Sequence, residues 1–334
     1  GDAGNIWYCN DVTLPTINWT NMSNGVIPTA FTDVQKVSGT NDFIATGIDG
    51  AVWKNTTGGV TNWQFKTSGT IENLNSIAVD IAGNGLIAAT NGKLYKLTNA
   101  ATTTPLLTNI PTGVAGKITD VAIQPSGTAA YATSSDGKVI FIPAYNAVTP
   151  TPFVITSYPQ AVNGVAFKSS AAAAVVGNNA LISNYFGTSS NVTKNLYTKD
   201  LRCINFYDVN NGFVIDSSHV IRRTIDGGNT WSVVLPWITN PTLNSIHATK
   251  TNQAILVGNS KFASVINNNA ITPMPSPGVP GGTNFMDVNF NDPKSFGVIV
   301  GASTRAAQIV PTGPTTYAIT SLGFAFTGPP AAFR

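Results

Sequence analysis

The feature that most constrains the fold is an internal repeat that runs through most of the 334 residues. Each copy starts with a polar-small-apolar tripeptide and continues, about ten residues later, with a short apolar run. The apolar residues of these tripeptides recur every 39 to 44 residues. They are Val34, Ile77, Val121, Val165, Ile204, Ile246 and Val288. Seven copies at this spacing indicate seven structural units of one kind.

Each copy contains four segments with the pattern of strands. The second segments, such as FIATG, AVVGN and VIVGA, are short, apolar and uncharged, as in strands covered on both faces. The third segments alternate apolar and polar residues, which is typical of strands nearer solvent. The fourth segments vary most, as an outer edge would. Because one such sheet cannot bury both faces alone, the sequence predicts an all-β fold: a seven-bladed β-propeller of four-stranded antiparallel blades.

The repeat also predicts one domain over residues 1–334 and a boundary for each unit. The expected blades cover residues 31–70, 71–115, 116–159, 160–198, 199–240, 241–280 and 281–321. Residues 1–30 and 322–334 flank the blades and are expected to close the ring. Either PTINWTN (Pro15 to Asn21) or LGFAF (Leu322 to Phe326) could add a strand to a terminal blade. The sequence does not choose between them.

One turn motif stands out, in the fifth copy. The pattern S/T-x-D-x-G-x-T-W is matched by Thr224, Asp226, Gly228, Thr230 and Trp231, and is known as the Asp-box. In such a turn the aspartate accepts backbone N–H bonds across a hairpin, glycine permits positive φ and the tryptophan packs between strands. We therefore interpret the motif as a structural turn and not as a catalytic site.

Through this motif and the phrase INFxDxNxGFV…IxRTxDGGxTW, the fifth copy resembles the BNR or Asp-box β-propellers. It looks most like the photosystem II assembly and stability factor family and its non-photosynthetic relatives. The first copy retains part of the Asp-box in Asp49-Gly50 and Trp63, and the third copy retains part of it in Asp136-Gly137. The resemblance implies a platform for assembly or interaction. The arginine-rich patch of the photosystem factors has few counterparts here, namely Arg202, Arg222, Arg223, Arg305 and Arg334.

Charge and hydropathy exclude two classes of partner. Only 10% of the residues are charged, the net charge is +3, and Arg222-Arg223 is the only adjacent basic pair, so nucleic acid is not an expected partner. No apolar run reaches the length of a membrane span, so no membrane insertion is expected. The start GDAGNIWYCN has neither the basic nor the apolar region of a signal peptide, so we expect a soluble, already processed chain.

Cysteines and sequons suggest an extracellular, cell-surface, periplasmic or virion-surface location. Cys9 and Cys203 permit one disulfide, with two buried thiols as the alternative. N-glycosylation sequons stand at Asn18, Asn21, Asn55 and Asn191, although a chain this rich in Asn and Thr produces some by chance.

The residues directly before the seven apolar anchors should lie near one mouth of a central channel. Three of them are acidic: Asp33, Asp120 and Asp287. The others are Ser76, Gly164, Cys203 and Ser245. Two interpretations remain open: a cation or ligand site of hard oxygen ligands, its metal unknown, or polar residues that line a wet channel and satisfy backbone groups.

Catalytic signals are weak. Sialidase chemistry needs three arginines and a Tyr–Glu pair. Arg202, Arg222 and Arg305 are the candidates for the three arginines, but Glu72 is the only glutamate. His219 and His247 lie in different copies without a nucleophile motif. No nucleotide or cofactor motif is present, so no cofactor is expected. The leading hypothesis is a non-enzymatic surface propeller that binds a protein partner or self-assembles. The alternatives are a glycan-binding propeller and a sialidase- or lyase-like one.

Overall fold

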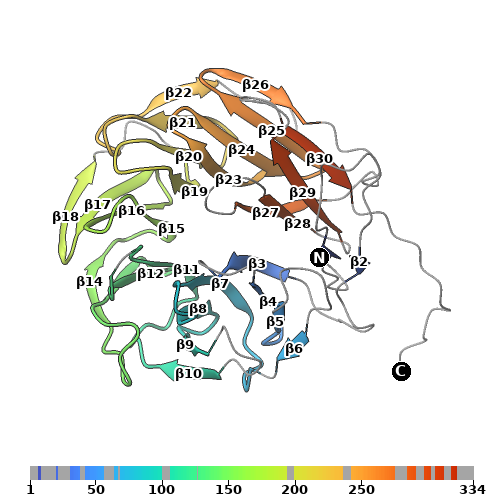
Figure 1. Cartoon of the computed structure of the whole chain (residues 1–334). Coiled ribbons are helices and arrows are strands. Elements are labelled where there is room, and N and C mark those ends of the chain that lie inside the picture. The colour runs from blue at the N-terminus through green and yellow to red at the C-terminus, as the bar shows by residue number, and fades with distance from the viewer. Residues whose placement is uncertain are drawn as a thin grey trace.

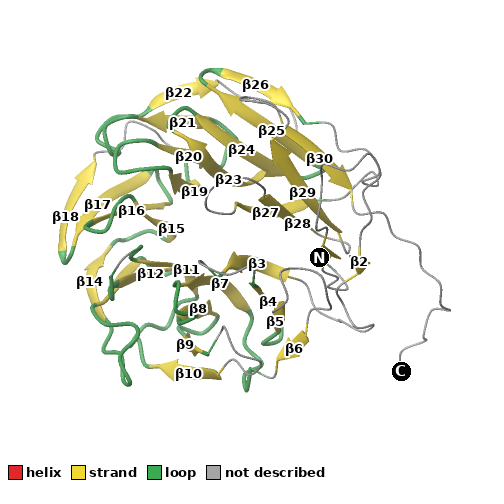
Figure 2. Ribbon diagram, in the orientation of Figure 1, coloured by secondary structure: helices red, strands yellow, loops and turns green. Residues whose placement is uncertain are grey.

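The regular structure is entirely β. The computed structural model describes residues 7–8, 20–21, 31–37, 42–55, 64–66, 68–99, 106–125, 127–193, 199–235, 242–274, 284–290, 297–301, 305–311 and 317–321. Within these ranges every regular element is a strand and no helix occurs (Figure 2). In the same ranges, no helix is therefore long and apolar enough to cross a membrane.

The strands form seven four-stranded antiparallel sheets and one two-stranded ribbon. Each large sheet consists of four consecutive strands, and the sheets stand radially around a centre with the first strand innermost (Figure 1). We number these sheets as blades 1 to 7 in chain order.

The bounds of the strands are as follows. Blade 1 contains β3 (Phe31–Lys36), β4 (Phe43–Gly47), β5 (Val52–Asn55) and β6 (Gln64–Lys66). Blade 2 contains β7 (Leu74–Val79), β8 (Gly85–Ala89), β9 (Leu94–Thr98) and β10 (Leu106–Ile110). Blade 3 contains β11 (Ile118–Ile123), β12 (Ala130–Ser134), β13 (Lys138–Ile142) and β14 (Phe153–Ser157). Blade 4 contains β15 (Val162–Phe167), β16 (Ala172–Gly177), β17 (Leu181–Phe186) and β18 (Ser189–Thr193). Blade 5 contains β19 (Leu201–Phe206), β20 (Gly212–Asp216), β21 (Ile221–Thr224) and β22 (Ser232–Leu235). Blade 6 contains β23 (Leu243–Lys250), β24 (Gln253–Gly258), β25 (Phe262–Asn267) and β26 (Ala270–Pro273). Blade 7 contains β27 (Phe285–Phe290), β28 (Gly297–Gly301), β29 (Arg305–Pro311) and β30 (Tyr317–Ser321).

All seven inner strands share one irregularity. Their apolar anchors, from Val34 to Val288, are only 2% to 7% exposed. Two residues before each anchor the pairing with the second strand shifts by one residue, which is a β-bulge. The extra residues are Thr32, Asn75, Thr119, Asn163, Arg202, Asn244 and Met286.

The bulge residues tie neighbouring blades together. Thr32 Oγ1, for example, donates a hydrogen bond to the carbonyl oxygen of Leu74, the first residue of the next inner strand, at 2.5 Å. The same bond runs from Asn75 to Ile118, from Thr119 to Val162, from Asn163 to Leu201 and from Asn244 to Phe285. Five junctions between blades therefore carry one repeated bond. Arg202 and Met286, which depart from the Thr/Asn pattern, are exposed.

Burial falls off only at the outermost strand. The second strands β8, β12, β16, β20 and β24 are buried along their whole length. The expectation that third strands lie nearer solvent was wrong for β9, β17 and β25, because adjacent blades cover both of their faces. Their polar residues are buried as well, including Lys96 and Asn184. The fourth strands β10, β14 and β26 are largely exposed.

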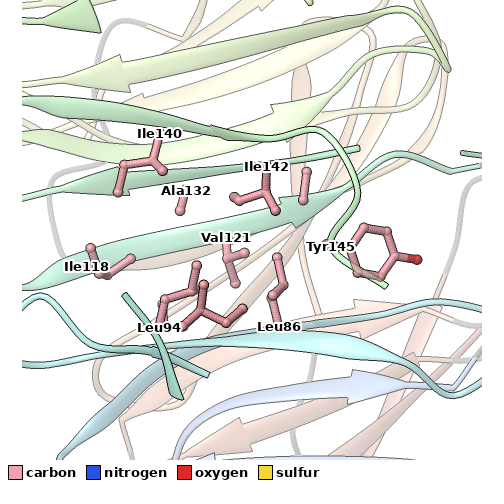
Figure 3. Packing of buried hydrophobic residues seen from close by; sticks show 11 residues of the cluster. Leu86, Leu94, Ile118, Val121, Ala132, Ile140, Ile142 and Tyr145 are labelled. Atoms are coloured by element: carbon pink, nitrogen blue, oxygen red, sulfur yellow. The ribbon is translucent and has the colours of Figure 1, made fainter. Parts of the chain in front are cut away.

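The hydrophobic core lies between blades. Six clusters of buried apolar residues each join two consecutive blades, from blades 1 and 2 to blades 6 and 7. Figure 3 shows the cluster in which Leu86 and Leu94 of blade 2 face Ile118, Val121 and Ile140 of blade 3. Fully burying one such aliphatic side chain stabilises the fold by about 1.5–3 kcal/mol, so each blade depends on its neighbours.

Two segments were candidates to add a strand to a terminal blade. The described residues of the first, Thr20–Asn21 (β2), pair with Trp7–Tyr8 (β1) in the separate ribbon. The other candidate, LGFAF, lies outside the described residues. Blade 7 draws its four strands from the C-terminal part of the chain and blade 1 from the N-terminal part, so they share no strand. Their inner strands β27 and β3 are in contact.

Candidate functional site

The residues after the seven bulges form a ring of interactions around the channel. Asp33 Oδ2 accepts the N–H of Ile77 in blade 2 at 2.8 Å. Ser76 Oγ donates to Asp120 Oδ1 in blade 3 at 2.7 Å, and Asp120 Oδ2 accepts the N–H of Val165 in blade 4 at 2.8 Å. Each bond crosses from one blade to the next because the bulge turns these side chains towards the following inner strand.

The second half of the ring continues the pattern with one gap. Gly164 contributes no side chain to the junction between blades 4 and 5. Cys203 accepts the N–H of Ile246 in blade 6, and Ser245 Oγ donates to Asp287 Oδ1 in blade 7 at 2.7 Å. The ring is completed by β27, which carries Asp287 and lies against β3, which carries Asp33. Among the five candidate ligands predicted from the repeat, hydrogen bonds join Ser76 to Asp120 and Ser245 to Asp287.

Burial dominates the electrostatics of this ring. It raises the pKa of Asp33 well above its usual value, and the nearby charge of Asp287 raises it further. Burial also raises the pKa of Asp120 and of Asp287, against the lowering effect of the N–H and hydroxyl groups that donate to them. The three aspartate residues are intermediate in exposure, whereas Ser76 and Ser245 are buried.

The geometry favours the second interpretation of the ring, in which its polar residues satisfy backbone groups. Each carboxylate already accepts bonds from protein donors: Asp33 from two N–H groups, and Asp120 from two N–H groups and a hydroxyl. Among the residues that the structure describes, no three His, Cys, Asp or Glu side chains come together as ligands for a metal ion. The ring residues therefore act on each other and on the backbone.

Of the two cysteines that could form a disulfide or remain thiols, the structure describes Cys203. Cys203 is a free thiol on the inner strand β19, turned towards blade 6. Burial raises its pKa to about 12. Cys9 lies outside the described residues, as does the sequon residue Asn18. Of the other sequon residues, Asn21 lies in β2, Asn55 in β5 and Asn191 in β18.

The Asp-box turn joins β21 to β22. Asp226 Oδ1 accepts both the Thr224 hydroxyl at 2.8 Å and the Thr230 N–H at 2.9 Å, and Asp226 Oδ2 accepts the Thr230 hydroxyl at 2.5 Å. Gly228 has a φ of 88°, and its carbonyl accepts the indole N–H of Trp231 at 3.1 Å. All of these contacts are internal to the turn, which matches the structural interpretation.

The candidate catalytic residues are occupied elsewhere. Arg222 forms an ion pair with Asp216 at 2.6 Å inside blade 5, where both side chains are buried. Arg202 lies exposed on the bulge of β19 and Arg305 begins β29 of blade 7. His219 accepts the N–H of Leu243 through Nδ1 at 3.2 Å, and the ring of His247 lies 5.4 Å from that of Phe290. The described contacts therefore do not assemble an arginine triad or a histidine-based one.

The structure shows a surface that the sequence interpretation missed. The inner strands all end at the same side of the ring, and we call this side the downstream face. It carries the turns from first to second and from third to fourth strands. Among the described residues, twelve large apolar side chains are exposed, and half of them lie on these turns or, in the case of Phe186, at the end of β17 next to one. They are Ile81, Val148, Phe186, Tyr207, Val209 and Ile225.

Four of these side chains lie at the downstream ends of two neighbouring blades: Phe186 in blade 4 and the other three in turns of blade 5. The apolar patch consists of Phe186, Tyr207, Val209 and Ile225, with exposures between 42% and 66%. The turns that bear it are bonded to each other, since Gly227 N–H donates to the carbonyl of Asn210 at 2.9 Å. Beneath the patch, Lys168 Nζ lies 5.7 Å from the ring centre of Phe186 and donates to Gly227 O at 2.5 Å. The patch thus has a fixed base that spans both blades.

Comparison with known proteins places the fold. No family model and no curated protein matches the chain. A solved structure titled "YCF48 bound to D1 peptide" superposes with a TM-score of 0.66 at 13% identity, covering 91% of this chain and 97% of the other. The fold is a β-propeller.

Two further structures give the same result. The WD40 β-propeller domain of Doa1 matches with a TM-score of 0.66 at 12% identity, over 86% of this chain and 94% of that one. YCF48 from Cyanidioschyzon merolae matches with 0.67 at 11% identity, over 90% and 98%. At these identities the comparisons establish the fold of this propeller alone.

Proposed function

We propose that this propeller is a non-enzymatic binding module that docks a protein partner on its downstream face. The observation that carries the proposal is the apolar patch of Phe186, Tyr207, Val209 and Ile225. A contiguous group of exposed apolar side chains on a folded surface is typical of a protein interaction site. Aromatic side chains are enriched at the centres of such sites.

The polar groups beside the patch define the partner. Asp208 accepts the N–H groups of Asn210 and Asn211 at 2.8 Å, and Asp226 is bonded within the Asp-box. Since these carboxylates are already engaged, they offer little to a charged ligand. The partner that fits is therefore a protein surface or peptide with apolar side chains and few charges.

Other properties support the same proposal. One of the structural neighbours, YCF48, is described as bound to a peptide, which is a precedent for the fold. The hydrogen-bonded state of Asp33, Asp120 and Asp287 leaves no free carboxylate pair of the kind glycosidases use. An extracellular or surface location is part of the proposal. It rests on the 10% content of charged residues and on the four sequons.

The test compares two double variants as baits for partners from the native source. Phe186→Ser with Ile225→Ser removes the two most exposed members of the patch. Leu106→Ser with Val233→Ser is the matched control, because these side chains are 58% and 47% exposed on the outer strands β10 and β22 and are not members of the patch. Size-exclusion chromatography with mass spectrometry identifies the bound protein, and titration with that protein gives the affinity. Thermal melts verify that both variants are folded.

We expect the patch variant to lose at least about tenfold in affinity, the effect of removing an interface hot spot, and the control to bind like the unaltered chain. Equal binding by both variants would place the interface elsewhere. If the chain binds no other protein and does not self-associate at any concentration tested, the protein-binding proposal is rejected. Glycan-array binding would then be the next experiment.

A further inference from the structure

One position of the third strands carries a long polar side chain in blades 1, 2, 4 and 5: Lys54, Lys96, Asn184 and Arg223. In each of these blades it pairs with the second-strand residue that directly precedes the partner of the anchor. That second-strand residue belongs to a core cluster shared with the following blade. Because residues directly opposite each other on paired strands lie on one face of the sheet, the four polar side chains point towards the following blade.

In blades 1, 2 and 4 this polar side chain is buried and has partners inside the chain. Lys54 Nζ lies 3.8 Å from a carboxylate oxygen of Asp42. Lys96 Nζ donates to two backbone carbonyls in the turn between β13 and β14 of the following blade. Asn184 Oδ1 accepts from Lys168, whose ammonium group also donates to a carbonyl in the turn between β21 and β22 of the following blade. Each of these polar groups is therefore satisfied within the fold.

Arg223 on β21 is the exception. Its Nε atom is buried and has no hydrogen-bond partner. Within the described part of the chain its guanidinium group has neither an acceptor nor an ion-pair partner. The contacts of this residue are made by its backbone, whose carbonyl accepts the Ser232 hydroxyl at 3.3 Å. Since buried donors are paired in the great majority of cases, an unpaired one in a partly exposed arginine calls for an acceptor.

The turn of the following blade explains why the acceptor is missing. In blades 3 and 5 the third and fourth strands are joined by residues 143–152 and 225–231, which supply the carbonyls just described. In blade 6 only Asn268 and Asn269 join β25 to β26. Asn268 is tied to its own blade, because its N–H donates to Asn252 O at 2.9 Å and its side-chain oxygen accepts from Asn252 Nδ2 at 2.7 Å. The short hairpin thus gives Arg223 no counterpart of the carbonyls that the lysines receive elsewhere.

The charge of the site defines the ligand. A guanidinium group presents its N–H donors in a planar fork, which matches the two oxygens of a carboxylate. Arg222 adds no second charge, because it alternates to the opposite face of β21 and is paired with Asp216. A phosphate group carries a charge of about −1.5 to −2, which one guanidinium group does not balance. The chemistry that fits is a singly charged, planar carboxylate.

We propose that Arg223 binds a carboxylate group from outside the chain, on the downstream face where blades 5 and 6 meet. Arg223 is the second-last residue of β21, which ends at this face. The site follows from an unpaired cation and a short hairpin, so it stands on other observations than the apolar patch, although Ile225 of the patch lies only two residues further along the chain.

The first test measures thermal unfolding of the full chain at neutral pH, in sodium chloride and in sodium acetate of equal ionic strength. Arg223→Met removes the guanidinium group and keeps an unbranched side chain. Lys96→Met is the matched control, because Lys96 holds the same position in blade 2 but finds its acceptors inside the chain.

In chloride we expect the Tm of Arg223→Met to stay within about 1 °C of that of the unaltered chain, and the Tm of Lys96→Met to fall by about 2–4 °C. Acetate should raise the Tm of the unaltered chain and of Lys96→Met by about 1–2 °C over chloride, and leave that of Arg223→Met unchanged. A loss in Arg223→Met as large as that in Lys96→Met would mean that Arg223 already has an acceptor. An equal effect of acetate on all three proteins would reject the site.

A measurement on the unaltered chain keeps the proposal testable if Lys96→Met does not fold. In nitrogen-15 NMR spectra the Nε–H signal of Arg223, assigned by its loss in Arg223→Met, should shift with acetate and reach a plateau. The signal of Arg202, an exposed arginine of the same blade, is the reference and should not saturate. No plateau for Arg223, or the same response for both arginines, would overturn the proposal.

The source of the carboxylate is identified with a protein partner captured by the unaltered chain. If an acidic group of that partner occupies the site, Arg223→Met should bind it at least about tenfold more weakly, while Arg202→Met binds like the unaltered chain. Unchanged affinity of Arg223→Met, together with saturable acetate binding, would assign the site to a small free carboxylate. Because the apolar patch is intact in both variants, failure at Arg223 remains distinct from failure of the patch.

Discussion

Lys168 of blade 4 donates a hydrogen bond to the carbonyl oxygen of Gly227 in the Asp-box turn of blade 5, at 2.5 Å. The same ammonium group donates to Asn184 Oδ1 at 2.9 Å and lies 5.7 Å from the ring centres of Phe186 and Phe206. Burial lowers the pKa of this lysine, and the nearby Asp226 carboxylate opposes that shift. One buried amine therefore anchors the Asp-box to the preceding blade and forms the base of the apolar patch.

Replacing this lysine tests that role. Lys168→Met keeps the length of the side chain but leaves Gly227 O and Asn184 Oδ1 without their donor, so we expect a loss of about 1–3 kcal/mol in the free energy of unfolding. Urea denaturation measures the loss. Lys138→Met is the control, since Lys138 bonds only to Ser157 at an exposed site, and it should stay within about 0.5 kcal/mol. Similar losses for both variants would contradict the anchoring role.

The carboxylate of the Asp-box gives a prediction with a pH dependence. Burial tends to raise the pKa of Asp226, but the bonds from Thr230 and Thr224 outweigh it and lower the pKa overall. A lowered pKa means that the stabilisation is present above the ordinary aspartate value of 3.8 and is lost as the pH falls through the folded-state value. We expect Asp226→Ala to cost about 1–2 kcal/mol at pH 7 and less at pH 3. Urea titrations at the two pH values measure the difference, and a loss that is equal at both would show that the charge plays no part.

Gly92 and Gly164 have different surroundings. Substituting each by alanine therefore distinguishes a position that requires the backbone conformation of glycine from one that merely lacks a side chain. Gly92, in the turn between β8 and β9, has a φ of 65°, and a Cβ there would lie 1.7 Å from the carbonyl oxygen of Val114. Gly164 has an ordinary φ, and its Cβ would meet the Cγ2 atom of Val176 at 3.3 Å, a contact that a small shift relieves.

We therefore expect Gly92→Ala to destabilise the propeller by at least about 2 kcal/mol and Gly164→Ala to change it by less than about 1 kcal/mol. Guanidinium denaturation of both variants gives the comparison. The reverse order would mean that the gap in the ring at Gly164 is itself required.

The sequence predicted the parts of the fold that are local and periodic. The anchors from Val34 to Val288 recur because each inner strand meets the same surroundings, and the Asp-box could be identified because all its partners lie between Thr224 and Trp231. The third strands were misjudged because residues such as Lys96 keep a polar end while buried, where Lys96 bonds to the carbonyls of Asn146 and Ala147. Alternation of apolar and polar residues does not distinguish that situation from exposure to water.

Contacts that depend on closing the ring were beyond a sequence-based prediction. The contact between β27 and β3 joins opposite ends of the chain, and although Asp33 and Asp287 hold the same position in the repeat, the repeat does not show which strands become neighbours when the ring closes. The bulges have no signature either, since their residues include Thr, Asn, Arg and Met. The apolar patch was missed because Tyr207, Val209 and Ile225 resemble strand residues, although they stand next to Asp208 and Asp226 in turns.

The thiol of Cys203 gives the last prediction. Burial raises its pKa to about 12, and the charges of Asp287 and Asp120 add to that effect against the N–H of Ile246 and the hydroxyl of Ser245. At pH 8 only about one thiol in ten thousand is then ionised, and the thiolate is the form that reacts. We expect Cys203 to resist iodoacetamide in the folded chain and to be labelled fully in guanidinium, as peptide mass spectrometry can show. Rapid labelling of the folded protein, or a Cys9–Cys203 peptide that separates only with reductant, would mean that this part of the channel opens in solution.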